Sequence, residues 1–369
     1  MEYTNIQAKK YIIVGLISFI VVILLFAEAF AGDARIIYPR FGINAIRHST
    51  DTLTVRFNPI PDSFQIFNGN FIGKWYKTNN TSDILLHLQN YKEGIYSIRY
   101  VGQSTVKIER HAIVIKNHNN YNDYLRLIFI TDTHIGYRHT TEKLRKWIKI
   151  INYENPDIVV FGGDNIEYQN SEYMETFTDL ANKINAPLFI ISGNHEHHNI
   201  FKLPLKDALF KKTIQSFDHY HLSLYPLSFY LMDSRNDNLP IPSRCKGPLK
   251  STVYWADTLL ASDTMPFKIF VMHGPPRDPS EYNQQNNDLV MNVAKNNGVN
   301  FILCGHTHVS AIYDNDMIKH DKIEKKYEPL VVQTGTACKT FMPFAVIREM
   351  DFYFETDSLN DKLIYLNEK

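Results

Sequence analysis

The stretch PLFIISGNHEHH, residues 187–198, places an asparagine, three histidines and a glutamate directly behind a short apolar run. A short continuous apolar run bounded by glycine is typical of a strand buried inside a sheet. Imidazole and carboxylate groups bind metal ions and transfer protons near neutral pH. The stretch is therefore either a histidine-rich surface loop or one side of a reaction site.

Four further apolar runs end in similar polar groups: LIFI before TDTH, IVVF before GGDN, IFVM before HG and FILC before GHTH. Amphipathic helical patterns lie between several of these runs, so we predict an α/β layered core. The carboxyl ends of strands in such sheets gather at one edge, where ligands bind. Singly, each polar residue is more often a helix cap or a surface side chain, but five groups together favour a site. The residues expected to converge are Asp132, His134, Asp164, Asn194, His195, His273, His306 and His308.

The ordered set D-x-H, G-D-N, G-N-H-E, H and G-H-x-H resembles the motifs of the calcineurin-like metallophosphoesterases. The resemblance covers roughly residues 125–344 and includes NPDIVVFGGD and GPLKSTVYWADTLL. It implies a four-layer αββα sandwich and an enzyme that hydrolyses phosphomonoesters or phosphodiesters. The nucleophile would be a hydroxide that bridges two metal ions.

Two cations about 3.5 to 4 Å apart can bind the oxygens of a phosphoester and lower the pKa of a trapped water. The resemblance implies that the carboxylate of Asp164 bridges the two ions. The remaining ligands would be Asp132, His134 and His308 for the first ion and Asn194, His273 and His306 for the second. This mixture of imidazole and oxygen ligands suits manganese, iron or zinc. By resemblance, His195 would protonate the leaving alkoxide or stabilise the transition state.

Several neighbouring residues have weaker assignments. Glu196 is expected to orient His195. Arg235 and Arg277 each lie just past an apolar run and are candidates for a phosphate contact, although an ordinary loop role is favoured for both. Tyr168 is one residue too far from the bridging aspartate to match the tyrosine ligand of purple acid phosphatases. We therefore expect Tyr168 to be a packing residue.

Residues 11–27, YIIVGLISFIVVILLFA, form an uncharged apolar run behind Lys9 and Lys10. Its length lies at the short end of the roughly 17 to 25 residues that span a bilayer. The preceding lysines indicate that the rest of the chain is exported. We favour a membrane anchor with the catalytic domain outside the cytoplasm. The following AEAFAG resembles a cleavage site, so secretion after signal-peptide cleavage is the alternative.

Between this run and the α/β pattern, alternating segments such as TLTVRF predict strands. We therefore predict three parts: residues 1–32 as the cytoplasmic N-terminus and anchor or signal peptide, 33–118 as a small β-sandwich, and 119–369 as the metallophosphoesterase domain. The segment LQNYKEGIYSIRYV resembles the late strands of immunoglobulin-like domains. This all-β domain is expected to be a spacer or a packing module.

The 39 basic and 39 acidic residues cancel, so the chain has no excess of positive charge that would indicate nucleic-acid binding. A metal-dependent nuclease on the same fold is therefore a disfavoured alternative. A catalytically silent scaffold is a second alternative, disfavoured because no ligand of the motif set is missing. The expected partners are a phosphoester substrate and a lipid bilayer, and the sequence indicates no protein partner.

Overall fold

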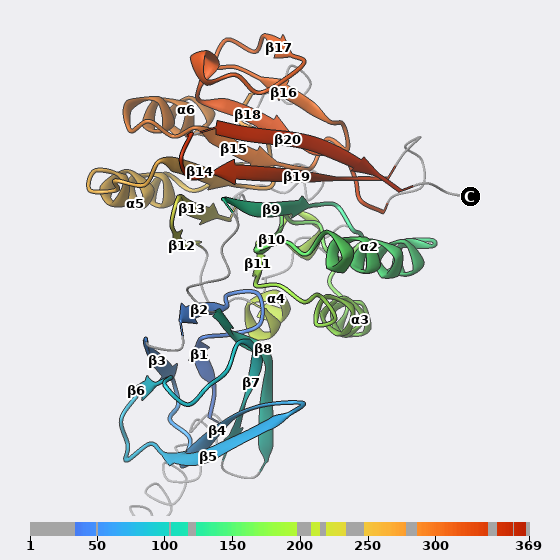
Figure 1. Cartoon of the computed structure of the whole chain (residues 1–369). Coiled ribbons are helices and arrows are strands. Elements are labelled where there is room, and N and C mark those ends of the chain that lie inside the picture. The colour runs from blue at the N-terminus through green and yellow to red at the C-terminus, as the bar shows by residue number, and fades with distance from the viewer. Residues whose placement is uncertain are drawn as a thin grey trace, which may run out of the picture.

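The structure is a computed structural model that describes residues 34–48, 51–102, 105–116, 123–197, 208–214, 219–233, 247–277, 286–338, 345–356 and 358–366. An all-β part, blue in Figure 1, lies at one end of the molecule, and an α/β part, green to red, forms the rest. The predicted membrane segment and Arg235 lie outside the described residues. Among the residues that the structure describes, every helix is too short or too polar to cross a membrane.

The all-β part contains two sheets that share one core. The first has three strands, β1 (Ile36–Tyr38), β3 (Thr52–Phe57) and β6 (Asp83–His87), in the order β1-β3-β6. The second has five, β2 (Ala45–His48), β4 (Ser63–Asn68), β5 (Phe71–Lys77), β7 (Gly94–Val101) and β8 (Val106–Lys116), in the order β2-β8-β7-β4-β5.

The core of the all-β part follows from the alternation of apolar and polar residues along its strands. Leu53, Val55 and Phe57 of β3 are all fully buried, because successive side chains of a strand point to opposite faces. Phe57 also contacts Phe64 of the other sheet, with 5.3 Å between the ring centroids. The immunoglobulin-like identity of this part stays a prediction.

The α/β part is built on two larger sheets. One contains β9 (Tyr124–Ile130), β10 (Ile158–Phe161), β11 (Leu188–Ile190), β19 (Val346–Tyr353) and β20 (Ser358–Tyr365), in the order β11-β10-β9-β19-β20. The other contains β12 (His219–Leu224), β13 (Leu227–Met232), β14 (Phe267–Val271), β15 (Phe301–Cys304), β16 (Ala311–Tyr313), β17 (Lys319–His320) and β18 (Leu330–Gln333), in the order β12-β13-β14-β15-β18-β16-β17. Strands β9, β10 and β11 run parallel, as do β13, β14, β15 and β18.

Helices cover the outer face of each large sheet. The helices are α2 (Thr140–Glu154), α3 (Ser171–Ala181), α4 (Ala208–Thr213), α5 (Lys250–Leu260) and α6 (Asn287–Asn296). One apolar core joins α2 and α3 to the first sheet, a second lies between the two sheets, and a third joins α5 and α6 to the second sheet. The predicted α/β sandwich is therefore confirmed, with its layers in the order helix, sheet, sheet, helix (Figure 1).

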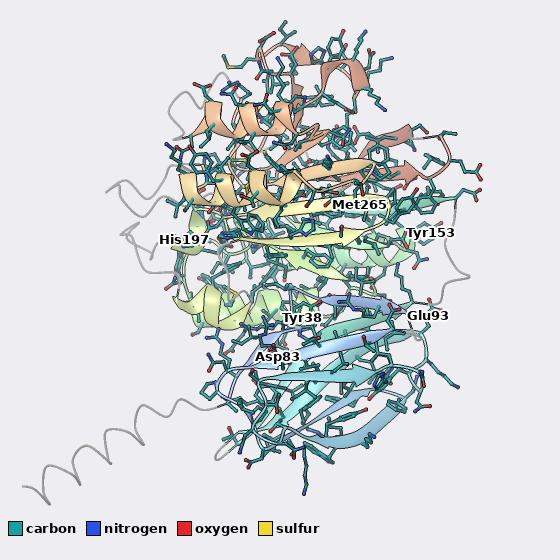
Figure 2. All side chains as sticks on the ribbon, turned by 90° about the vertical axis from the view of Figure 1, so that its left-hand side faces the viewer. Tyr38, Asp83, Glu93, Tyr153, His197 and Met265 are labelled. Atoms are coloured by element: carbon teal, nitrogen blue, oxygen red, sulfur yellow. The ribbon has the colours of Figure 1, made fainter. Side chains whose placement is uncertain are left out.

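The all-β part packs against β11, an edge strand of the first large sheet. Ile43 forms a bridge with Phe189, and the amide of Ile190 donates to the carbonyl of Gly42 at 3.0 Å. Tyr38 packs against both the all-β core and the core between the two large sheets. Figure 2 shows Tyr38 at this boundary. The two parts are thus joined by backbone hydrogen bonds as well as by side-chain packing.

Candidate metal centre

The predicted site residues occupy loops at the carboxyl ends of parallel strands. Asp132 and His134 follow β9, Asp164 follows β10, Asn194 and His195 follow β11, His273 follows β14, and His306 and His308 follow β15. Because the two large sheets stack face to face, strand ends from both sheets meet at one place. The sequence pattern placed each residue at a strand end, and the sandwich brings those ends together.

Five of these residues adopt a backbone conformation that is rare for residues other than glycine. Asp132, His134, Asp164, His306 and His308 have φ between 46° and 71°, in the left-handed region. The main chain around them is fixed by hydrogen bonds, for example from the Asp132 amide to the Gly163 carbonyl at 3.0 Å. Such conformations persist where the surroundings hold them, and they gather at functional sites.

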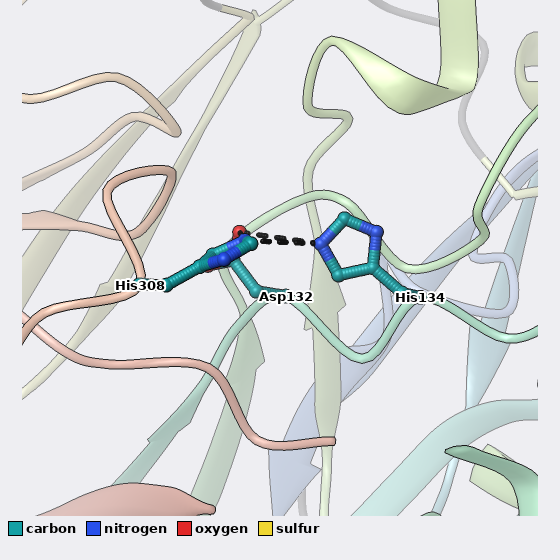
Figure 3. Close-up of side chains that lie close together, drawn as sticks. All are labelled: Asp132, His134 and His308. Atoms are coloured by element: carbon teal, nitrogen blue, oxygen red, sulfur yellow. Dashed lines mark hydrogen bonds and ion pairs between the residues drawn. The ribbon is translucent and has the colours of Figure 1, made fainter. Parts of the chain in front are cut away.

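The first ligand group consists of Asp132, His134 and His308 (Figure 3). His308 Nε2 lies 3.1 Å from Asp132 Oδ1, and His134 Nε2 lies 3.2 Å from His308 Nε2. His134 Nε2 is also 3.7 Å from Asp132 Oδ1. Three potential ligand atoms therefore face one point, in a site where Asp132 and His134 are completely buried.

The second ligand group consists of Asp164, His273 and His306. His273 Nε2 lies 3.1 Å from Asp164 Oδ2, and His273 Nδ1 lies 2.8 Å from the Gly162 carbonyl. Because a carbonyl only accepts, Nδ1 carries the proton and Nε2 is left to face the centre. His134 Nε2 is 3.8 Å from Asp164 Oδ2, so the two groups adjoin at this carboxylate.

The donors in both groups fit a pair of cations. The buried Oδ1 of Asn194 has no hydrogen-bond partner among the described residues, although an unsatisfied buried acceptor costs about 1–3 kcal/mol. Burial favours the neutral form of Asp164, but the nearby histidines, His273 first, outweigh it and hold the pKa of this carboxyl well below its usual range. Buried ionised carboxylates beside imidazoles and an amide oxygen form a ligand set for transition metals.

His195 lies beside this centre. Its amide donates to Asp164 Oδ1 at 2.9 Å, and its Nε2 is 3.8 Å from Asp164 Oδ2. Its Nδ1 lies 2.5 Å from the carbonyl of Glu167, so this nitrogen carries the proton and Nε2 faces the centre. Burial lowers the pKa of His195 to about 4, although Asp164 and Glu167 act in the opposite direction. The imidazole is therefore neutral at pH 7 in this arrangement.

Glu167 was missed by the sequence interpretation. Its carboxylate Oε2 lies 2.9 Å from His134 Nδ1, while its carbonyl holds His195. One residue thus orients two imidazoles that face the centre, a role that carboxylates often have behind metal-binding histidines. The available signal was its place in GDNIEY, three residues after Asp164.

Glu196 is fully buried and has a different role from the one predicted. Its carboxylate accepts hydrogen bonds from four backbone amides, those of Asp164, Asn165, Ile166 and Gly193, at 2.6 to 3.2 Å. Burial raises the pKa of Glu196 to about 7, and Asp164 adds to this effect. Glu196 therefore holds two of the site loops together. The structure corrects the prediction that the Glu196 side chain orients His195, because Glu167 orients this imidazole.

The other weaker assignments have mixed outcomes. Arg277 donates to Asp288 at 2.7 Å and to the Asn315 carbonyl at 3.1 Å, so its guanidinium is bound to a helix and a loop. A phosphate contact by Arg277 stays a prediction. Tyr168 packs edge-on against Tyr173 and shares a hydrogen bond of 3.0 Å with it. This is the packing role expected for Tyr168.

Gly193, in the loop after β11, allows the loops that carry the ligands to approach one another. A Cβ on Gly193 would overlap the carboxylate of Asp164 and lie 2.8 Å from the ring of His273. Contacts under 3.0 Å are essentially never seen for real Cβ atoms, so any larger residue would push the ligand loops apart. The glycine of the GNHE motif is thus required by the close packing of the site.

A layered α/β sandwich with two adjoining groups of buried histidine and aspartate ligands defines the class of dinuclear metal hydrolases. Residues 125–310, just over half of the chain, match the calcineurin-like phosphoesterase family. The chain therefore belongs to that family and is a metallophosphoesterase. This confirms the family and the enzyme class predicted from the motifs.

One known protein is similar to the chain in sequence, and two solved structures align with it. The chain is 29% identical over 102 residues to the uncharacterized metallophosphoesterase YkuE of Bacillus subtilis (strain 168), a match that covers 27% of this chain and only 36% of that protein. Purple acid phosphatase PPD1 from yellow lupin (Lupinus luteus) seeds is similar in structure, with a TM-score of 0.56 and 12% identity over 90% of this chain and 71% of its own. A dimetal phosphatase from Danio rerio aligns with a TM-score of 0.49 and 15% identity, over 66% of this chain and 99% of its own.

Proposed function

We propose that this enzyme hydrolyses phosphomonoesters or phosphodiesters with two metal ions held by the two ligand groups. The observation that supports this most directly is that the groups adjoin at Asp164, with His195 beside the same carboxylate. Asp132, His134 and His308 would hold one ion. His273, His306 and the Asn194 amide oxygen would hold the other, and Asp164 would serve both.

The bound ions would polarise the phosphate and lower the pKa of a water at the centre. The residues of the chain hold the ligands in position and transfer protons. Glu167 fixes the rings of His134 and His195, and Glu196 fixes the loops that carry Asp164 and Gly193. His195 Nε2, which carries no proton in this arrangement, would take a proton from the water at the centre and pass it to the substrate oxygen that leaves.

The ligand chemistry supports manganese, iron or zinc in this centre, because hard cations such as calcium prefer ligand sets made of oxygen alone. We also propose that the catalytic part lies outside the cytoplasm, either anchored to a membrane or secreted. The support is the uncharged run of residues 11–27 behind two lysines.

The test is turnover of two chromogenic substrates by the full chain, purified in detergent and loaded with manganese. Bis-p-nitrophenyl phosphate reports diester cleavage, and p-nitrophenyl phosphate reports monoester cleavage. Asn194→Ala and His273→Ala are expected to abolish turnover of both while the far-UV circular dichroism stays unchanged. His320→Ala is the matched control, because this histidine pairs with Asp314 in the turn before β17. Full activity in both ligand variants would overturn the proposal.

A further inference from the structure

The outward face of the five-stranded sheet in the all-β part carries large apolar side chains. Ile72, Trp75, Val106 and Ile108 are 70%, 45%, 59% and 51% exposed. Exposed apolar side chains that are scattered singly are normal, but a contiguous group marks an interaction surface. Whether these four belong together depends on the pairing of the strands.

The strand register places these side chains on one face. Trp75 of β5 lies opposite Gln65 of β4, which lies opposite Arg99 of β7, and Arg99 lies opposite Ile108 of β8. Residues directly opposite in paired strands share a face, so this row crosses four strands. Val106 lies two residues from Ile108 and shares its face, and Ile72 lies opposite Phe67, two residues from Gln65.

The guanidinium of Arg99 lies in the middle of this row. It is 5.3 Å from the ring centroid of Phe67 and 5.5 Å from that of Trp75, within the range of cation–π contact. Lys77 is exposed on β5 two residues from Trp75 and shares its face. The Trp75 face is the surface made of Phe67, Ile72, Trp75, Lys77, Arg99, Val106 and Ile108. None of these seven described residues is acidic, so the face combines apolar surface with positive charge.

The chain enters the all-β part next to β8, on the side of the sheet that faces the core and opposite the Trp75 face. The carbonyl of Ala34 accepts a hydrogen bond of 3.0 Å from Lys107, which lies between Val106 and Ile108 on β8. The uncharged run ends at Ala27, seven residues before Ala34. Seven residues span at most about 25 Å at full extension. A bilayer that received this run would therefore lie within roughly 25 Å of Ala34, which contacts the side chain of Lys107 on the strand that carries Val106 and Ile108.

We propose that the Trp75 face lies on the surface of a lipid bilayer and inserts its apolar side chains at the level of the head groups. Tryptophan is enriched at this depth, since its ring is apolar with one polar edge. Lys77 and Arg99 match the negative charge of anionic lipids. The inference rests on the proposed membrane location. It gives the all-β part the role of contacting the bilayer and holding the catalytic part at its surface.

The experiment uses the full chain reconstituted into vesicles of phosphatidylcholine and phosphatidylglycerol, with or without brominated acyl chains that quench nearby tryptophans. The chain has three tryptophans, Trp75, Trp147 and Trp255. Trp147 is fully buried in the α/β part, and Trp255 packs against the core beneath α5. We expect brominated lipid to quench the emission of Trp75, which is one of the three tryptophans, and so to remove roughly a third of the total emission.

Variants separate the proposed contact from other sources of quenching. Trp75→Phe is expected to abolish quenching, and the matched Trp255→Phe is expected to retain it. Ile108→Glu keeps the Trp75 probe but places a negative charge on the face, so quenching should fall several-fold. The same variants should hydrolyse p-nitrophenyl phosphate at the rate of the parent protein. Loss of hydrolysis in the parent protein would instead count against the proposed function.

Two results would overturn the proposal. One is equal Trp75 emission with brominated and ordinary lipids. The other is a blue shift of Trp75 emission that depends on protein concentration and occurs without lipid, because a second copy of the chain would then cover the face.

Discussion

His111 of β8 is expected to make the stability of the protein depend on pH. Its side chain is buried where the all-β part meets the α/β part, with Nε2 2.8 Å from the Ala186 carbonyl. Burial lowers the pKa of His111 from 6.5 to about 4. Between these two values the unfolded chain binds more protons than the folded chain, so the folded state loses stability as the pH falls.

The magnitude follows from the two pKa values. Stability from the neutral imidazole is fully present above pH 6.5 and is lost as the pH falls towards 4. Lowering the pH from 7.5 to 5 should remove about 2 kcal/mol of unfolding free energy through this one group. Other groups also titrate in this range, so the comparison needs a variant that lacks only the imidazole.

His111→Asn is that variant, because asparagine tolerates the left-handed backbone of this position, where φ is 51°. The assay is urea unfolding of both proteins at pH 7.5 and pH 5, followed by circular dichroism. The parent protein should lose about 2 kcal/mol more than the variant between the two pH values. Equal losses would refute the reasoning, since nearby groups such as Glu109 and Arg40 are present in both proteins.

Three changes at the centre have expected outcomes. Glu167→Gln should weaken manganese binding about 10- to 100-fold, measured by calorimetry, because His134 loses the carboxylate that orients it. Gly193→Ala should lower both unfolding free energy and metal affinity, since the added methyl overlaps Asp164. His195→Asn should lower kcat about 10²- to 10⁴-fold, with KM and metal affinity nearly unchanged, because proton exchange with the substrate is lost.

The controls for these changes are surface residues of the same type. Glu172→Gln lies at the exposed start of α3 and should leave metal binding unchanged. Gly69→Ala meets no atom within 4 Å of its new Cβ and should leave stability nearly unchanged. Metal affinity of Glu167→Gln equal to that of the parent protein would contradict the orienting role. An unchanged kcat in His195→Asn would remove His195 from the chemistry.

The α/β layers and the position of the centre could be predicted from the sequence. Each buried strand reads as a continuous apolar run, and each run ends in a ligand type, so a general property of α/β sheets predicts where the polar groups meet. The predictions for Asp132, Asp164 and His273 needed no knowledge of loop conformation. A ligand at a strand end is already close to its final place.

The residues that hold the ligands and their loops in place could not be predicted in this way. Glu167 and Glu196 are both acids near ligand motifs, and the sequence does not distinguish a carboxylate that faces an imidazole from one that faces backbone amides. Their directions depend on left-handed turns such as that at Asp164 and on contacts between loops that are far apart in sequence. The contact of Ile43 with Phe189 is equally nonlocal, since no periodic pattern marks it.

The pairing of residues 42–44 with β11 covers an edge strand of the catalytic part. An uncovered edge strand presents a row of amides and carbonyls to which another chain can add a strand. Here the segment around Ile43 takes those positions along Leu188, Phe189 and Ile190, with Asn44 Oδ1 accepting from the Leu188 amide at 2.6 Å. A fragment cut at the predicted boundary near residue 119 would therefore keep every proposed metal ligand and still expose an aggregation-prone edge.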